Sequence, residues 1–197
     1  GKTTVLIAKL IILANRMPLK NNKGICVLTH TNVAIEEIKK KLGAKSDVLF
    51  KYPNYFGTLQ SFIDKYLAIP CYKEKYKRNI EMIDDAYVDA IYSKIKYWNG
   101  LYPTFMRCKV KVKSIKYNFE TEEYSFGNVN INKSNKDFHL LNGRLENNYI
   151  RFNEAIQLGS IYLENYPELK ELFSERFCLV MVDEMQDTTE EAYDILE

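Results

Sequence analysis

Residues 179–187 read Leu-Val-Met-Val-Asp-Glu-Met-Gln-Asp. The first four are apolar, too few for a helix, and followed at once by acids, which predicts a strand buried on both faces inside a parallel sheet. In an open α/β sheet, ligands bind outside the carboxyl ends of the strands. We therefore expect Asp183 and Glu184 to lie at the mouth of a crevice.

The other half of such a site stands at the opposite end of the sequence. Residues 1–4, Gly-Lys-Thr-Thr, have the form of the end of a phosphate-binding loop and run into a helical pattern. In that chemistry a lysine contacts the β- and γ-phosphates, a hydroxyl and an acid hold Mg²⁺, and a second carboxylate orients the attacking water. We assign these roles, in that order, to Lys2, Thr3, Asp183 and Glu184. Either half alone is weak, because an Asp-Glu pair after a strand is usually only a polar strand end; together they predict one magnesium nucleotide site.

Composition places the chain among soluble globular proteins, with 46% apolar and 27% charged residues. The longest apolar run, residues 5–14, is interrupted by Lys9 and is too short to span a bilayer, so we expect a cytoplasmic protein with no membrane partner. The four cysteines are scattered and only two histidines are present, which indicates neither a disulfide framework nor a zinc site.

Charge is distributed unevenly along the chain. Residues 65–118 hold 12 Lys and Arg against 5 Asp and Glu, whereas residues 164–197 hold 2 against 11. A basic middle favours contact with a polyanion. The alternative, equally consistent with charge alone, is that these lysines only keep the surface solvated.

The first seventy residues alternate between helical and strand patterns. The expected order is a helix over 2–16, a strand over 25–28, a helix over 32–42, short strands at 48–50 and 55–56, and a helix over 59–67 that ends before Pro70. This order is typical of a parallel α/β sheet.

The alternation then stops. A helix is expected over 84–98, then a strand over 109–113 with one basic and one apolar face, a turn over 120–123, a returning strand over 124–131, a loop over 128–135 and a helix over 153–165. Ile115, Tyr117 and Phe119 are apolar in the opposite phase to residues 109–113, which predicts a bend near Ser114. The architecture that follows is an α/β domain, residues 1–70 and 150–197, interrupted by a mostly helical insertion, residues 71–149, that carries a β-hairpin.

With these elements placed, the sequence resembles superfamily 1 DNA helicases of the UvrD/Rep type. Residues 1–4 are similar to the end of motif I, 27–42 to motif Ia, 57–62 to motif Ib and 182–188 to motif II. The resemblance covers about 120 residues in two blocks. It implies a RecA-like P-loop NTPase sheet, called domain 1A in the family, with residues 71–149 in the position of the inserted domain 1B.

The resemblance also implies roles for individual residues. It keeps Lys2 and Glu184 as the catalytic pair, with Glu184 as the base, and Thr3 and Asp183 at the metal. Nucleotide-binding residues would be Gly1, Lys2, Thr3, Thr4 and Gln186, and Gln186 with Asp187 would couple the nucleotide to motion. Residues expected to contact DNA are Thr29, His30, Thr31, Asn32, Gly57, Thr58 and Gln60, to which the basic strand adds Lys109, Lys111 and Lys113.

Two of these motifs depart from the family pattern. His30 replaces the usual aromatic residue of motif Ia; a histidine still stacks on a base, and the alternative is a strand-end histidine bonded within the sheet. In motif Ib, Leu59 and Gln60 replace the usual aromatic residue and histidine, and Gln60 can still reach phosphate or sugar.

The implied function is ATP-dependent translocation or unwinding on single-stranded DNA with ATP and Mg²⁺ as cofactors, in repair or phage defence and with a nuclease as a possible partner. Two alternatives remain: a P-loop NTPase that regulates a nuclease without unwinding, and a vestigial NTPase that acts as a nucleic-acid-binding or interaction module. The chain has the form of a fragment, without the later motifs and the second RecA-like domain. Because an arginine supplied across a cleft contributes roughly 10³ to 10⁵ in rate, we expect the fragment alone to be nearly inert.

Overall fold

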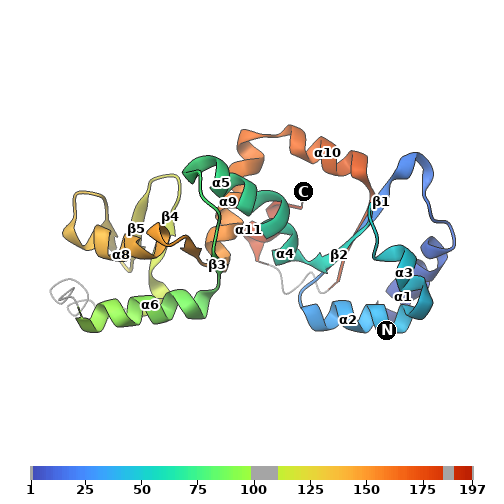
Figure 1. Ribbon diagram of the computed structural model, residues 1–197, viewed down its shortest axis with the longest axis horizontal. Coiled ribbons are helices and arrows are strands. Elements are labelled where there is room, and N and C mark those ends of the chain that lie inside the picture. Colours follow the sequence, from blue (N-terminus) through green and yellow to red (C-terminus); the bar gives the residue numbers. More distant parts are fainter. Residues whose placement is uncertain (1, 99–110, 184–188, 197) are drawn as a thin grey trace. The chain divides into compact units, whose positions relative to one another are not determined.

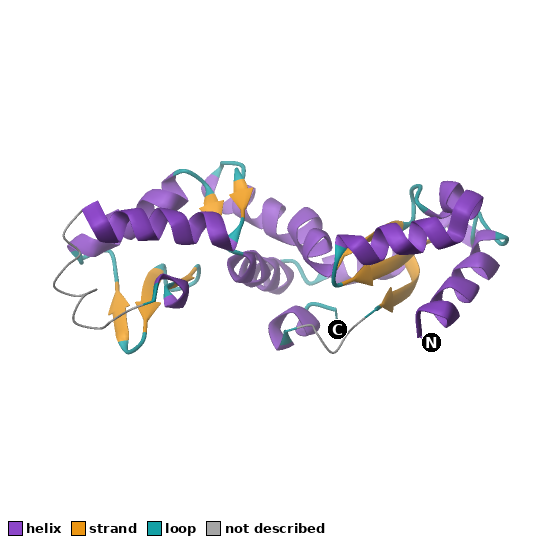
Figure 2. Ribbon diagram, turned by 90° about the horizontal axis from the view of Figure 1, so that it is seen from below, coloured by secondary structure: helices purple, strands orange, loops and turns teal. Residues whose placement is uncertain are grey.

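The computed structural model of this chain describes residues 2–98, 111–183 and 189–196, and it divides into two compact units (Figure 1). Unit 1 comprises residues 1–65 and 163–197, and unit 2 comprises residues 66–162. Helices make up most of both units, and the strands gather in separate small sheets (Figure 2).

Unit 1 is built on a three-stranded parallel sheet. Its strands are β1 (Gly24–Thr29), β2 (Tyr55–Thr58) and β8 (Phe177–Val182), in the order β2-β1-β8. Val27 of β1 stands opposite Phe56 of β2 and Met181 of β8. This confirms that the strands expected at 25–28 and 179–182 belong to one parallel sheet.

The burial expected for β8 is wrong. All six residues of β1 are buried, whereas Leu179 and Val180 of β8 are 38% and 51% exposed. The reason is position, because β1 lies between two strands while β8 pairs with β1 alone among the described residues. A short apolar run indicates a strand but does not say whether neighbours cover both of its edges.

Helices α1 (Lys2–Ala14) and α2 (Asn32–Leu42) pack on the sheet and confirm two predicted helices. Their buried side chains form one core with β1 and α3, consisting of Leu10, Ala14, Ile25, Val27, Ile38, Leu42 and Leu49. Helix α2 ends where Gly43 takes φ +54°, a conformation that favours glycine, and the Gly43 amide donates to the carbonyls of Lys39 and Lys40.

The strand expected at 48–50 is wrong, because that segment is helical. Helix α3 (Ser46–Leu49) continues from a 3-10 turn, η2 (Gly43–Lys45). The Ser46 hydroxyl donates to the Gly43 carbonyl at 2.7 Å, and the Phe50 amide donates to the Ser46 carbonyl at 2.9 Å. A β-branched residue next to Leu and Phe favours a strand only weakly, and these local bonds outweigh that preference.

The helix after β2 is longer and less regular than expected. It comprises α4 (Leu59–Ile63), a π-helical turn η3 (Asp64–Ala68) and α5 (Ile69–Tyr76). Pro70 does not end it, because this proline lies in the first turn of α5, where a missing amide proton costs little. Helix α5 and most of η3 belong to unit 2. The remaining elements of unit 1 are η1 (Lys20–Asn22), α10 (Glu168–Arg176) and α11 (Glu190–Asp194).

Unit 2 contains helices α6 (Asp85–Trp98), α8 (Lys136–Glu146) and α9 (Phe152–Asn165), with a short parallel pair β3 (Met82–Ile83) and β7 (Tyr149–Ile150). The helices expected over 84–98 and 153–165 are confirmed as α6 and α9, whereas α8 was not expected. The signal for α8 was present: Phe138, Leu141 and Leu145 recur at helical spacing and are buried, and the Asn135 side chain caps the helix by accepting from the Asp137 amide at 2.9 Å.

A three-stranded antiparallel sheet completes unit 2, with β4 (Lys116–Asn118), β5 (Glu123–Phe126) and β6 (Val129–Ile131). The single returning strand expected over 124–131, and the loop over 128–135, are therefore partly wrong, because Gly127 at φ +55° turns the chain between β5 and β6.

The basic strand is also wrong over its described part. Residues 112–114 form a 3-10 turn, η4 (Val112–Ser114), in which the Ser114 amide donates to the Lys111 carbonyl at 2.8 Å. Lys111 and Lys113 thus do not share a strand face, and Lys109 lies outside the described residues. The buried alternation of Ile115, Tyr117 and Phe119 is confirmed.

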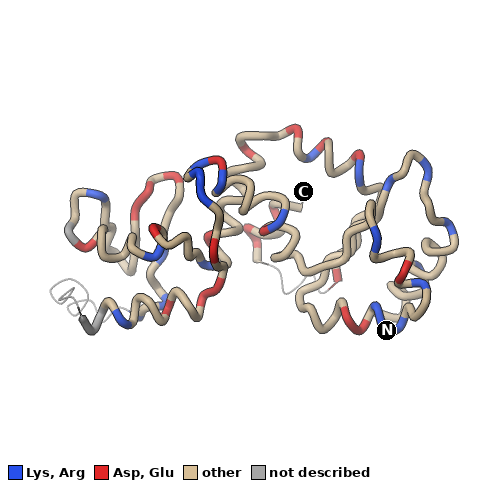
Figure 3. Tube along the Cα trace, in the orientation of Figure 1, with Lys and Arg blue, Asp and Glu red and all other residues tan. Residues whose placement is uncertain are grey.

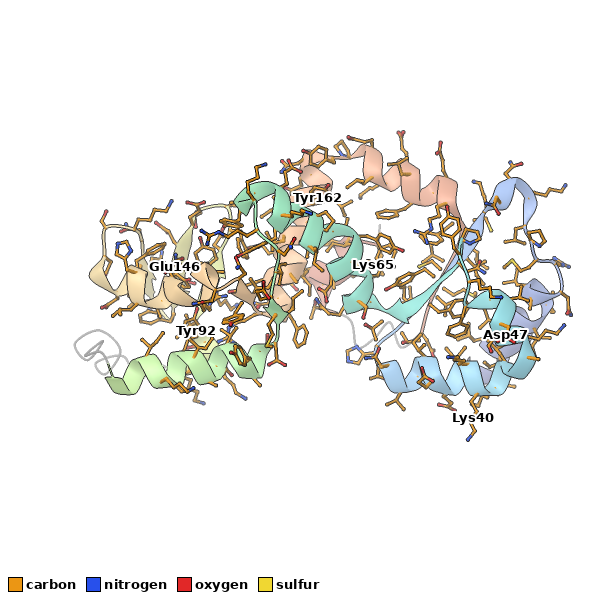
Figure 4. The ribbon with its side chains drawn as sticks, in the orientation of Figure 1. Lys40, Asp47, Lys65, Tyr92, Glu146 and Tyr162 are labelled. Carbon is orange, nitrogen blue, oxygen red and sulfur yellow. The ribbon has the colours of Figure 1, made fainter. Side chains whose placement is uncertain are left out.

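A buried ion pair connects the helices of unit 2. Arg144 of α8 and Glu154 of α9 are each 1% exposed, and the Arg144 guanidinium donates to both Glu154 carboxylate oxygens and to the Tyr92 hydroxyl of α6. The Tyr92 side chain points from α6 into unit 2 (Figure 4). Such a pair recovers its desolvation cost only with good geometry and further hydrogen bonds, which the Arg144 bond to the Tyr149 carbonyl supplies.

Candidate nucleotide and nucleic-acid site

The carboxyl ends of the three parallel strands meet at one edge of the sheet. Thr29 at the end of β1 stands opposite Thr58 at the end of β2, and Leu28 stands opposite Val182 of β8. The Asp183 amide donates to the Leu28 carbonyl at 2.8 Å, which extends the ladder by one residue. Asp183 is therefore held at the edge where an open α/β sheet binds ligands.

The loop after β1 is held by its own side chains. Thr29 is 2% exposed and its hydroxyl donates to the Thr31 carbonyl at 2.9 Å. Thr31 caps α2, since its hydroxyl accepts from the Ala34 amide at 3.2 Å. These bonds leave His30 and Asn32 exposed at the sheet edge. No hydrogen bond joins the His30 ring to another residue in the described ranges, so the strand-end bonding that we weighed for it is not seen there.

The segment after β2 is held in the same way, by a threonine hydroxyl that caps the following helix. The Thr58 hydroxyl accepts from the Ser61 amide at 3.0 Å and caps α4, while Gly57 precedes it within β2. Gln60, on the first turn of α4, donates from Nε2 to the Asp64 carboxylate at 2.7 Å. The predicted contact residues of the second loop thus come from the same sheet edge as those of the first.

Asp64 is a residue that the sequence analysis missed. Burial raises its pKa to about 6, and the hydrogen bond from Gln60 opposes that rise. It opens the π-helical turn η3, a rare geometry that is frequent at functional sites. The i, i+4 spacing of Gln60 and Asp64 on one helix face was the available signal.

The phosphate-binding half is described only in part. Helix α1 begins at Lys2, with Thr3 partly buried and Thr4 exposed, and it has no acidic residue in its first turn, so its amino end suits an anion. The Lys2 side chain, together with Gly1, Glu184, Gln186 and Asp187, lies outside the described part. The expected proximity of Lys2 and Asp183 therefore stays a prediction.

Within the described ranges, no group of three or more His, Cys, Asp or Glu side chains is placed so that it could hold a metal ion. A magnesium nucleotide needs fewer protein ligands than that, because the ion keeps several waters and binds the phosphates. A hydroxyl such as that of Thr3 and a carboxylate such as that of Asp183 are suitable in kind. No helix in these ranges is both long and apolar enough to cross a bilayer.

Comparison with known proteins gives two matches. A family model described as the UvrD/REP helicase N-terminal domain matches residues 1–197. The chain is also 24% identical, over 215 aligned residues, to a protein named ATP-dependent DNA helicase Rep from Buchnera aphidicola subsp. Schizaphis graminum. That alignment covers 100% of this chain and 30% of the relative, so the chain spans less than a third of the relative's length.

Proposed function

This chain belongs to the family of UvrD/REP helicase N-terminal domains, and we propose that it forms the nucleotide-binding part of an ATP-dependent helicase that moves along single-stranded DNA. The observation that carries the proposal is the shared sheet edge. Asp183 and the loops after β1 and β2 stand there side by side, from three segments far apart in sequence.

We assign the nucleotide to the amino end of α1 and to the segment after β8. Gly1, Lys2, Thr3 and Thr4 would hold the phosphates, and Thr3 with Asp183 would hold Mg²⁺, with Gln186 beside the nucleotide. When bound, Mg²⁺ neutralises charge on the phosphates. Glu184 would accept the proton of the attacking water, and Lys2 would stabilise negative charge on the γ-phosphate.

The DNA strand would follow the loops after β1 and β2. His30 offers an exposed ring for stacking on a base, and Thr31, Asn32 and Gly57 offer polar backbone or side-chain atoms at the edge. The hydroxyls of Thr29, Thr31 and Thr58 are already bonded within the protein, so these three hydroxyls shape the loops. Gln60 keeps its carbonyl oxygen for a ligand while Nε2 is held by Asp64.

The division into domains is part of the same proposal. Residues 1–70 and 150–197 would form the RecA-like domain 1A, and residues 71–149 the inserted domain 1B. The compact units, with boundaries at 65/66 and 162/163, support an insertion of this kind. The antiparallel sheet of unit 2 has three strands where we expected a hairpin.

The test is Glu184→Gln in the intact protein that carries this chain. We expect Mg-ATP binding to remain and DNA-stimulated hydrolysis to fall by roughly 10²- to 10⁴-fold, because the base is lost while size and hydrogen bonding are kept. Glu190→Gln, an exposed glutamate on α11, is the matched control and should hydrolyse ATP at the parental rate.

Parental turnover in Glu184→Gln would reject Glu184 as the base. Hydrolysis that does not respond to single-stranded DNA would instead favour the NTPase that regulates a nuclease. Binding of DNA without hydrolysis in the parental protein would favour the interaction module.

A further inference from the structure

One continuous helical rod crosses the boundary between the two units. Helix α4, the π-helical turn η3 and helix α5 follow one another without a loop over residues 59–76, and Ala68, where η3 meets α5, has a helical φ of −66° and ψ of −48°. The boundary at 65/66 falls inside η3. Lys65, labelled in Figure 4, is the last residue of unit 1 on this rod. The turn that joins the units is therefore the irregular one.

Each end of the rod is anchored in its own unit. The Phe62 ring of α4 has its centroid 5.3 Å from that of Phe173 and 6.4 Å from that of Phe177, all within unit 1. The Tyr72 hydroxyl of α5 donates to Asn148 Oδ1 at 3.2 Å, within unit 2. A change in the shape of η3 would therefore turn unit 2 together with α5.

The rod is weakest at η3, for local reasons. A π turn closes i→i+5 hydrogen bonds and so holds one residue more than an α turn, and sharp bends in helices fall at such turns and at prolines. Pro70, in the first turn of α5, supplies no amide hydrogen to the turn before it. Residues 66–72 carry no charge, so no i,i+4 ion pair braces them, whereas Lys and Arg gather at the C-terminal end of α5 (Figure 3). Bending at η3 thus costs less than bending within α4 or α5.

The chain crosses the boundary a second time, and there a helix is close to its end. Unit 2 ends at Tyr162, also labelled in Figure 4, which lies in the last turn of α9. Helix α9 ends at Asn165, and Pro167 then stands at the N-cap of α10. Residues at the ends of elements are the ones that absorb the φ and ψ changes of a hinge motion. The second crossing can therefore follow a bend at the first.

We propose that η3 is a hinge on which unit 2 turns, with the last turn of α9 following the motion. Gln60 Nε2 donates to the Asp64 carboxylate at 2.7 Å, and this bond braces α4 up to the first residue of the hinge. Because Thr58 at the sheet edge caps α4, the hinge begins close to that edge. The inference goes beyond the proposed function, since bending at η3 needs neither nucleotide nor DNA.

The test is the distance between two spin labels, one in each unit, measured by double electron–electron resonance in the intact protein that carries this chain. Lys40→Cys in α2 and Glu146→Cys in α8 place the labels at exposed positions, both labelled in Figure 4. A second pair within unit 1, Lys20→Cys with Lys40→Cys, gives the width of the distance distribution that the labels alone produce.

Native thiols must not take up the label. Exposed cysteines, Cys178 among them, are replaced by serine in every variant. Cys26 and Cys71 are buried, and burial raises the pKa of their thiols to about 12 and about 11. Because the thiolate is the reactive form, these two cysteines stay unlabelled during a short reaction.

In the parent we expect a broader distance distribution for the pair across the units than for the pair within unit 1. Deletion of Lys65 removes the extra residue and converts η3 into an α turn, so the cross-unit distribution should narrow to the width of the unit 1 pair. Lys65→Ala is the matched control. It loses the contact of Lys65 Nζ with the Tyr55 ring, 5.8 Å from the centroid, but keeps the number of residues and should keep the parental width.

Equal widths for the two label pairs in the parent would overturn the hinge, and so would the parental width in the Lys65 deletion. If the deletion does not fold, Pro70→Ala decides in the same way, because it restores an amide donor next to η3 and should also narrow the distribution. None of these distances depends on Glu184. Failure of the hinge and failure of the base in Glu184→Gln are therefore distinguishable.

Discussion

Hydrogen bonds divide the residues at the sheet edge into those that hold the loops and those that stay exposed for the proposed ligand. Thr29, Thr31 and Thr58 place their hydroxyls on backbone atoms of their own loops. His30 and Asn32 stand between them and remain exposed. A loop whose polar residues are already paired holds its exposed neighbours in place, which lowers the entropy cost of binding.

Asp64 provides a prediction at this scale. Burial raises its pKa from 3.8 to about 6, so the folded state holds the proton more tightly than the unfolded state, and the stabilisation gained by protonation is lost as pH rises from about 4 to 6. Asp64→Asn should therefore flatten the slope of the free energy of unfolding, measured in urea, against pH. It should also raise that free energy at pH 7 by about 1–2 kcal/mol, a figure discounted for the partial exposure of the side chain. The exposed Asp194→Asn should keep the parental slope. A steeper slope in Asp64→Asn would contradict the argument.

Elements differ in how far their sequence pattern depends on neighbours. Helix α2 has an N-cap, basic residues in its last turn and a terminal glycine, and it forms where expected. Strand β8 has an equally clear apolar run, but its burial depends on which strands lie beside it. Among the described residues it has one neighbour, and its middle residues are exposed.

Two leucines on adjacent strands test this difference. Leu28 of β1 is 0% exposed and Leu179 of β8 is 38% exposed. Leu28→Ala should lower the free energy of unfolding by about 2–5 kcal/mol, because it leaves a cavity in a packed core. Leu179→Ala should cost less than about 1 kcal/mol. Equal losses in chemical denaturation would show that β8 is covered in solution.

The whole molecule combines an acidic segment in unit 1 with a basic segment that lies mostly in unit 2. Residues 164–197 are strongly acidic, and residues 65–118 are strongly basic. The proposed binding of single-stranded DNA should therefore weaken steeply with salt, because each neutralised phosphate releases counterions.

The triple variant Lys109→Ala, Lys111→Ala and Lys113→Ala measures how much of this salt dependence comes from the three lysines of the basic segment. We expect the slope of log affinity against log salt to flatten by roughly 0.7 for each phosphate that the variant no longer neutralises, with little sequence bias. The alternative is that these lysines guard an exposed edge strand against aggregation. That alternative is weakened because residues 112–114 form a 3-10 turn and not a strand. The control Lys39→Ala, Lys40→Ala and Lys41→Ala removes three charges from the end of α2. If the slope flattened in that control and stayed unchanged in the triple variant, the assignment of phosphate contacts to Lys109, Lys111 and Lys113 would be rejected.

Sequence alone was sufficient for the elements whose signals are local. Periodicity, caps and short apolar runs predict the strands at 25–28 and 179–182, helices α1, α2, α6 and α9, and the place of Asp183 at a strand end. The family resemblance, carried by four short motifs, is confirmed by the match over residues 1–197.

Tertiary structure decided what depends on packing between distant segments. The exposure of β8 and the raised pKa of Asp64 depend on what packs beside them. The helical state of 46–49 and the helix through Pro70 are local features, set by hydrogen bonds within four residues and by the place of the proline in a first turn. Packing also forms a cavity of unit 2 that Tyr76 lines, because its walls come from residues as far apart in sequence as Tyr72 and Glu146. Local propensities amount to only tenths of a kilocalorie per residue, whereas burial of one side chain contributes about 1.5–3 kcal/mol, so packing prevails wherever the two disagree.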